Sequence, residues 1–236
     1  MQVNNPLRFP RSKGGRGSVG RPLGASSDIT KAAILDSAEE LFANSGYDGT
    51  SIRDIASAAG VAIAVITYHF GAKEHLFDAV IRRRATVLTQ MRLAALDATR
   101  RQAGAALLPI ELLVRSYVSP FVVQGQKGDR GWRNYAALMG RLSNSVLGTS
   151  VIHRHYDEMA RQFLVEFQRS LPQVDSAAIV GGFMTMVSAM LFNCAATGRS
   201  EALSAMLGQP AAKTDTVEQL VRFCVAGFRG LIPCDD

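Results

Sequence analysis

Ser51 and Arg53 are the residues whose types and spacing first indicate a chemistry, namely the binding of an anion. They begin a predicted short helix, where backbone N–H groups are still unpaired and the helix dipole favours negative charge. Lys31, near the start of an earlier predicted helix, is a further candidate to contact a phosphate. The sequence contains no nucleophile elbow, phosphate-binding loop or zinc-protease helix. We therefore expect a binding protein and not an enzyme.

The helix that positions Ser51 and Arg53 is one half of a predicted helix-turn-helix. Its apolar stripe at helical spacing is formed by Ile52, Ile55, Ala56 and Ala59. Thr50 or Ser51 caps this helix, and Gly60 permits the left-handed conformation that ends it. A second helix begins near Ala62 and is expected to bury Val61, Ile66 and Phe70. Such a second helix fits the major groove of DNA, although many all-α proteins that bind no DNA share the pattern.

Two runs of sequence around this motif carry a family resemblance. They are AILDSAEELFANSGYDGTSIRDIASAAGV and ITYHFGAKEHLFDAVI, within residues 30–81. Together they closely resemble the DNA-binding domain of the tetracycline-repressor (TetR) family. The resemblance implies an all-α protein, in which a three-helix helix-turn-helix domain precedes a larger helical domain for ligand binding and dimerisation. We assign residues 27–72 to the first domain and residues 73–236 to the second.

The resemblance also implies which residues contact DNA. Those expected to clamp the phosphate backbone are Ser51, Arg53, Tyr68, His69 and Lys73. For His69 a purely structural role is the alternative. Ile63, Ala64 and Thr67 are expected to read bases, helped by Tyr68. The first two replace polar residues that are common in the family, so readout should rely on contact with thymine methyl groups and on DNA shape.

Residues 1–26 form a predicted flexible basic arm. The formal net charge is +6, and residues 1–27 contain five basic residues and no acid. Gly20-Arg21-Pro22 resembles the centre of an AT-hook, which places Arg21 in the minor groove of DNA; a solvated tail with nonspecific phosphate attraction is the alternative. The arm has no apolar run of signal-peptide length, so we expect a cytoplasmic protein. Cys194, Cys224 and Cys234 fit a reducing compartment.

The remainder of the chain predicts only helices. One continues from near Lys73 towards Gly104, with Leu76, Val80, Val87, Met91 and Ala94 at near-heptad steps. Its Arg82-Arg83-Arg84 run is either a solvated face or a DNA-steering patch. The later helices are expected at 109–123, 129–145, 150–171, 176–196 and 216–231.

Residues 176–198 carry no charge and are long enough to span a bilayer. Their polar residues and the lack of flanking basic or aromatic clusters argue against a membrane span. Such a helix is otherwise buried on all sides, and the family resemblance places one side of it against a partner subunit. The expected homodimer interface comprises Gly181, Gly182, Ala189, Leu220, Cys224, Gly227 and Phe228.

The predicted effector pocket is a set of bulky side chains on these helices. It comprises Phe121, Trp132, Tyr135, Met139, Phe163, Phe167 and Met184. Ordinary core packing is the alternative for each of them. His153 and His155 stand two residues apart and do not face each other on a helix. We expect neither a metal site nor a cofactor.

The leading hypothesis is a homodimeric transcriptional repressor that leaves its double-stranded DNA operator when a small apolar molecule fills the C-terminal domain. One alternative is a DNA-binding protein or an activator that responds to no effector. Another is an enzyme with an accessory DNA-binding head.

Overall fold

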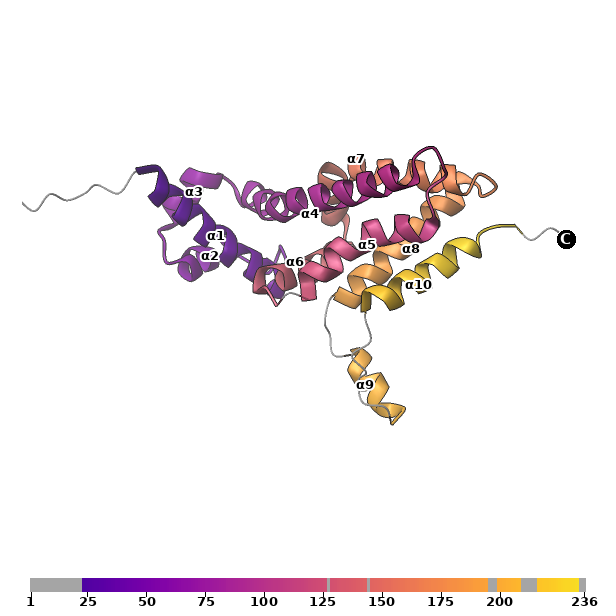
Figure 1. Ribbon diagram of the computed structural model, residues 1–236. Helices are drawn as coiled ribbons and strands as arrows, with labels where there is room; N and C mark the ends of the chain where they lie inside the picture. Colours follow the sequence, from indigo (N-terminus) through magenta and orange to yellow (C-terminus); the bar gives the residue numbers. More distant parts are fainter. Residues whose placement is uncertain (1–22, 127, 144, 195–198, 209–215, 234–236) are drawn as a thin grey trace, which may run out of the picture.

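The structure is a computed structural model that describes residues 23–126, 128–143, 145–194, 199–208 and 216–233 (Figure 1). These residues form ten α-helices and, within the described ranges, no strand. The predicted all-α architecture is confirmed. The basic arm with Arg21, and the terminal Cys234, lie outside the described residues.

Three helices form the N-terminal head: α1 (Leu23–Ser45), α2 (Ile52–Ala59) and α3 (Ile63–Phe70). Ile34, Phe42, Ile55 and Ile66 meet in its core with no exposed surface. Burying such side chains is worth roughly 1.5–3 kcal/mol each, which exceeds what short helices gain from intrinsic propensity. Helix α1 begins before the predicted start at residue 27 or 28, so Leu23 to Ser26 belong to a helix.

Helix α4 (Lys73–Ala103) joins the head to the body and runs along the length of the body in Figure 1. Its buried stripe continues through Leu88, Arg92 and Leu96. Two residues of the near-heptad series lie outside this stripe, since Val87 is 42% exposed and Ala94 is exposed. Helix α4 contacts α1 and α3 of the head as well as α5 and α7 of the body, so different faces of the helix are buried along its length.

The other helices of the body are α5 (Ile110–Gln126), α6 (Arg130–Leu142), α7 (Val146–Ser170), α8 (Ser176–Cys194) and α10 (Thr216–Arg229). Each overlaps a helix expected from the sequence. Aromatic rings fill the space between them: Tyr117 meets Phe163 and Phe183 edge to face, and Phe167 stacks on Phe228. Helix α10 packs on α5 and α8.

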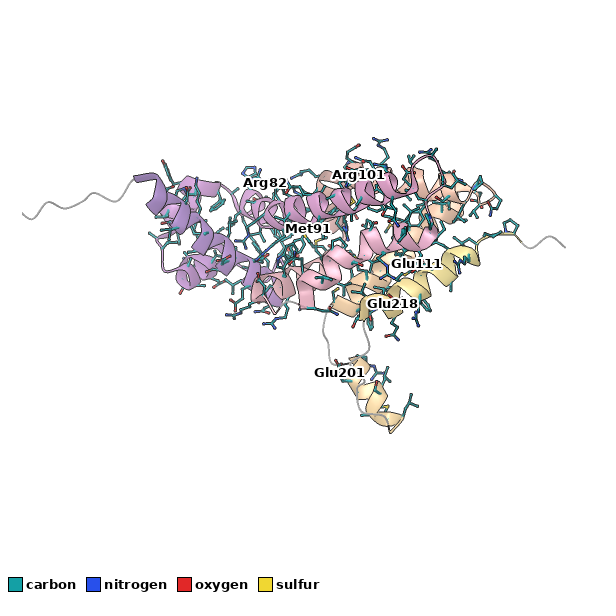
Figure 2. All side chains as sticks on the ribbon, viewed as in Figure 1. Arg82, Met91, Arg101, Glu111, Glu201 and Glu218 are labelled. Atoms are coloured by element: carbon teal, nitrogen blue, oxygen red, sulfur yellow. The ribbon has the colours of Figure 1, made fainter. Side chains whose placement is uncertain are left out.

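The contact between α5 and α10 also has a charged rim. Arg115 of α5 donates to Glu111 at 3.2 Å and to Glu218 of α10 at 2.8 Å. Figure 2 shows Glu111 and Glu218 on these neighbouring helices. Helix α9 (Arg199–Met206), which the sequence analysis missed, stands apart from the body (Figure 1), and its Glu201 lies far from the other labelled side chains (Figure 2).

Candidate nucleic-acid interface and core cavity

The helix-turn-helix is closed by local hydrogen bonds at both ends of α2. The Ser51 hydroxyl accepts the N–H of Asp54, and the Asp54 carboxylate accepts the N–H of Ser51 at 2.9 Å. Gly60 adopts φ 66°, and its N–H bonds to the carbonyl of Ser57. An L-residue loses about 1–2 kcal/mol in this left-handed region, which explains the glycine. The turn therefore sets the direction of α3.

The outer face of α3 presents the side chains that the sequence assigned to base readout. Ile66 is fully buried, whereas Ile63 is 45% and Tyr68 84% exposed. Ala64 and Thr67 are also exposed. The Thr67 hydroxyl donates to the carbonyl of Ile63 at 3.2 Å. Tyr68 and Ile63 thus give α3 an exposed apolar face, which suits contact with a partner.

The two candidate phosphate contacts at the start of α2 differ in whether an acidic side chain already binds them. The Ser51 hydroxyl is 2.6 Å from the Asp54 carboxylate, so an acidic group of the chain already occupies this helix end. Hydrogen bonds from the Ser51 side chain and backbone hold the pKa of Asp54 below its usual value. Arg53 is exposed and forms no ion pair with a described residue. Contact of either residue with phosphate remains a prediction.

The structure brings two other predicted contacts together. Lys31 of α1 and His69 of α3 line a hollow of about 530 Å³ that Arg82 of α4 also borders. Lys73 lies apart from this hollow, with its ammonium 4.1 Å from the centre of the Tyr47 ring. Burial and the hydrogen bond to Glu74 raise the pKa of Tyr47 to about 12, so the phenol stays neutral beneath the lysine. The Tyr47 ring thus holds the side chain of Lys73 at the start of α4.

The arginine run of α4 is a solvated surface at only one of its three positions. Arg82 is exposed, but Arg83 donates to Asp36 and to Glu39 of α1, both at 2.6 Å. Arg84 donates two hydrogen bonds of 3.0 Å to Glu39, which is only 1% exposed. The guanidinium of Arg84 also lies 5.1 Å from the Trp132 ring of α6. This cluster joins the head to both α4 and α6.

A cavity of about 160 Å³ lies in the body between α4, α5, α6, α7 and α8. Of the predicted pocket residues, Phe121, Met139 and Met184 line it. The other four, Trp132, Tyr135, Phe163 and Phe167, are buried and do not line it. Their rings pack on other aromatic side chains, as between Trp132 and Tyr135. These four residues therefore belong to the packed core of the body and do not face the cavity.

The sequence analysis missed a buried charged residue of this cavity. Arg92 lines it and is only 2% exposed. Its Nε donates to the carbonyl of Tyr117 at 2.9 Å, and its guanidinium lies 3.8 Å from the centre of the Tyr117 ring. The available signal was the spacing of Leu88, Arg92 and Leu96, which places a charged residue on an apolar stripe.

The predicted dimer-interface residues divide into two groups. Gly181 and Gly227 are exposed, and a Cβ added at either would meet no described side chain within 4 Å. Leu220, Cys224 and Phe228 are buried inside the chain, where Phe228 lies against Gly182. Ala189 is half-buried. Gly181 and Gly227 line a hollow of about 380 Å³ between α8 and α10. Exposed Phe223, which the sequence analysis did not select, lines this hollow as well.

A helix-turn-helix head joined by one long helix to an all-α body defines a class of DNA-binding regulatory proteins. Residues 34–80 match the family of bacterial regulatory proteins called the tetR family, and residues 115–227 match the tetracyclin repressor-like C-terminal domain. The chain belongs to the tetR family. This confirms the resemblance seen in the sequence.

Individual relatives support the same assignment. The transcriptional repressor Rv3405c of Mycobacterium tuberculosis is 39% identical over 71 residues, which cover 30% of this chain and 38% of the relative. The repressor AcnR of Corynebacterium glutamicum is 36% identical over 62 residues, covering 26% and 33%. The hemolysin II transcriptional regulator HlyIIR has a similar fold, with a TM-score of 0.57 and 19% identity over 84% of this chain and 97% of that protein.

Proposed function

We propose that this protein is a homodimeric transcriptional repressor that binds an operator in double-stranded DNA and releases it when a small molecule fills the cavity of the body. The observation that carries the proposal is the exposed outer face of α3. The inner side of the head is fully packed, with Ile55 and Ile66 at 0% exposure. The packed core of the head thus holds α3 with this face outward. This arrangement suits insertion into a major groove.

Base recognition would depend on apolar contact. Ile63 and Ala64 have no group that can pair with a base edge, but they can contact the methyl group of thymine. Tyr68 supplies a large surface and a phenolic hydroxyl at the end of α3. Arg53, Lys31 and His69 would hold the phosphates and set the register of the helix, without reading sequence.

Dimerisation would bring two such heads onto one duplex. Val180 and Met184 of α8 are 47% and 56% exposed, and Phe223 of α10 is 69% exposed. Among the described helices, α8 is the one long and apolar enough to cross a membrane by length and composition. A second copy that covers α8 and α10 accounts for this apolar face in a regulator. The two α3 helices would then contact half-sites about one DNA turn (~34 Å) or a multiple apart.

The cavity is lined by two helices, α4 and α6, that also contact the head. Leu88 and Arg92 line it from α4, which begins at the head, and Met139 lines it from α6, which packs on α1. A ligand that fits one arrangement of α4 and α6 better than another shifts the population of head positions. Release requires that this arrangement bind DNA less well, because only a difference in affinity moves the equilibrium.

The test is a Tyr68→Ala variant, measured on DNA fragments that the wild-type protein selects from a random pool. We expect at least about a fivefold loss of affinity, because an aromatic side chain that anchors an interface is commonly worth more than 1 kcal/mol. Sedimentation should show that the variant remains a dimer. Val165→Ala, at an exposed position of α7, is the matched control and should bind as the wild type does. Unchanged affinity of Tyr68→Ala, or a wild-type protein that stays monomeric, would contradict the proposal.

A further inference from the structure

Arg92 is a buried cation to which the described part of the chain supplies no anion. The side chain is 2% exposed, and among the described residues no carboxylate forms an ion pair with it within 4.0 Å. Its polar contacts are the carbonyl of Tyr117 at 2.9 Å and the sulfur of Met190 at 3.4 Å. Both are neutral acceptors. A buried charge is otherwise paired or bound to an ion of opposite sign.

The hydroxyl groups around Arg92 do not supply the missing charge either. Burial raises the pKa of Tyr156, which lines the cavity, to about 12, and it raises the pKa of Tyr117 and Tyr135 as well. These phenols are neutral at physiological pH. The Tyr156 hydroxyl is hydrogen-bonded to that of Tyr135 and remains a polar group on the cavity wall. Asp157, at the exposed edge of the cavity, is bonded to His153.

The rest of the cavity wall is largely apolar. Side chains without a polar group that line it include Leu88, Phe121, Ile152, Phe183, Val187 and Leu191. The volume of about 160 Å³ is close to that of an engineered apolar cavity of about 150 Å³ that binds benzene. A molecule of this size has room for one ring or a short chain, and Arg92 adds one site for a negative group.

We propose that this cavity binds a small monocarboxylate, with the carboxylate on the guanidinium of Arg92 and the apolar body against Leu88, Phe121 and Leu191. A planar guanidinium matches a carboxylate through paired hydrogen bonds, which are stronger than neutral ones. The charge of Arg92 is then neutralised by the ligand. The inference rests on the proposed function for the role of the acid as effector, and it replaces the purely apolar ligand expected from the sequence with an acid.

Calorimetric titration of the full chain with matched pairs of probes tests the binding step. Benzoate is compared with benzamide, and hexanoate with hexanamide, at neutral pH. We expect at least one acid to bind the wild-type protein at least about tenfold more tightly than its amide, because a hydrogen bond between charged groups exceeds a neutral one. Equal affinity of acid and amide in both pairs, or no acid bound at about 10 mM, would overturn the inference.

Three variants assign the preference to Arg92. Arg92→Met should remove the preference for acids, and Arg92→Lys, which keeps the charge, should retain part of it. Arg101→Met, at an exposed position on the outer side of the same helix (Figure 2), should bind as the wild type does. A preference that survives in Arg92→Met would contradict the assignment. If that variant does not fold, the comparison of Arg92→Lys with the wild-type acid and amide pairs still decides the matter.

Adding selected operator DNA separates this inference from the proposed function. Release of DNA by an acid from the wild-type protein, but not from Arg92→Met, would support both. An acid that binds at Arg92 without releasing DNA would support the inference and contradict the proposed release. Release by the amides with no preference for acids would support the proposed function and overturn the inference.

Discussion

Arg84 and Arg92 lie about two turns apart on the same helix, and the chain treats their charges in opposite ways. Arg84 is paired with Glu39 through two hydrogen bonds of 3.0 Å. Arg92 is more deeply buried, at 2% exposure, and has no described carboxylate partner. Among the described residues, a carboxylate therefore neutralises the arginine that joins the head to the body, and none neutralises the cavity arginine.

The difference separates a structural charge from a binding charge. Around Arg84, helices α1, α4 and α6 meet, so an internal partner fixes the position of the head on the body. Around Arg92, an internal carboxylate would fill the cavity and compete with any ligand. Leaving a buried cation unpaired lowers stability, and such cost is common at sites that serve function. Variants at the two positions should therefore respond differently.

The largest expected effect comes from breaking the Arg84 cluster with Glu39→Gln. This change removes a carboxylate that is 1% exposed and leaves Arg84 facing a neutral group, while Arg83 keeps its ion pair with Asp36. We expect the free energy of unfolding to fall by about 3 kcal/mol, the lower end for a buried pair, because both arginines keep some access to water. Chemical denaturation measures this change.

Glu40→Gln is the matched control for that measurement. Glu40 pairs with Arg130 at the surface, where the two side chains are 35% and 72% exposed. Exposed pairs contribute about 0–1 kcal/mol, so this variant should be close to the wild type. Equal losses for Glu39→Gln and Glu40→Gln would show that burial of the Arg84 cluster has no special role.

A smaller effect is expected from Gly131→Ala, which disturbs the same cluster by shape alone. A Cβ at this position would overlap Nη2 of Arg84 and would lie 3.1 Å from a carboxylate oxygen of Glu39. Overpacking costs about 1–3 kcal/mol, while alanine gains about 1 kcal/mol over glycine in a helix. We expect a net loss of about 1 kcal/mol in thermal or chemical unfolding. Gly140→Ala, on the same helix and with open space at its Cβ, should show no loss, and a loss of equal size there would refute the steric explanation.

The head was predictable because the features that determine it are local in sequence. The cap at Ser51, the left-handed Gly60 and the apolar spacing of α2 lie within one short stretch, and the structure contains each of them. Even the outward face of α3 followed from helical periodicity, as Tyr68 shows. Where only the nearest turns decide a conformation, sequence patterns suffice.

The cavity was not predictable in the same way. Whether Arg92 points inward depends on α5 and α8, since its contacts with Tyr117 and Met190 join residues far apart in the chain. Bulky side chains such as Phe163 and Phe167 could not be divided into core and cavity, because both environments select the same residue types. The partner of Arg84 is equally remote, so the arginine run could be read only as a surface feature.

The smallest expected effect on stability comes from Arg92→Met without any ligand. It is the sharpest test of the difference between Arg84 and Arg92. The change removes the hydrogen bond to the Tyr117 carbonyl, the weaker one to the Met190 sulfur and the contact with the Tyr117 ring, together worth about 2–3 kcal/mol. It also removes a desolvated charge, whose penalty is several kcal/mol when no anion is present. We therefore expect the free energy of unfolding to stay within about 1 kcal/mol of the wild-type value or to rise. A fall as large as that of Glu39→Gln in the same denaturation assay would mean that Arg92 is a structural residue, like Arg84.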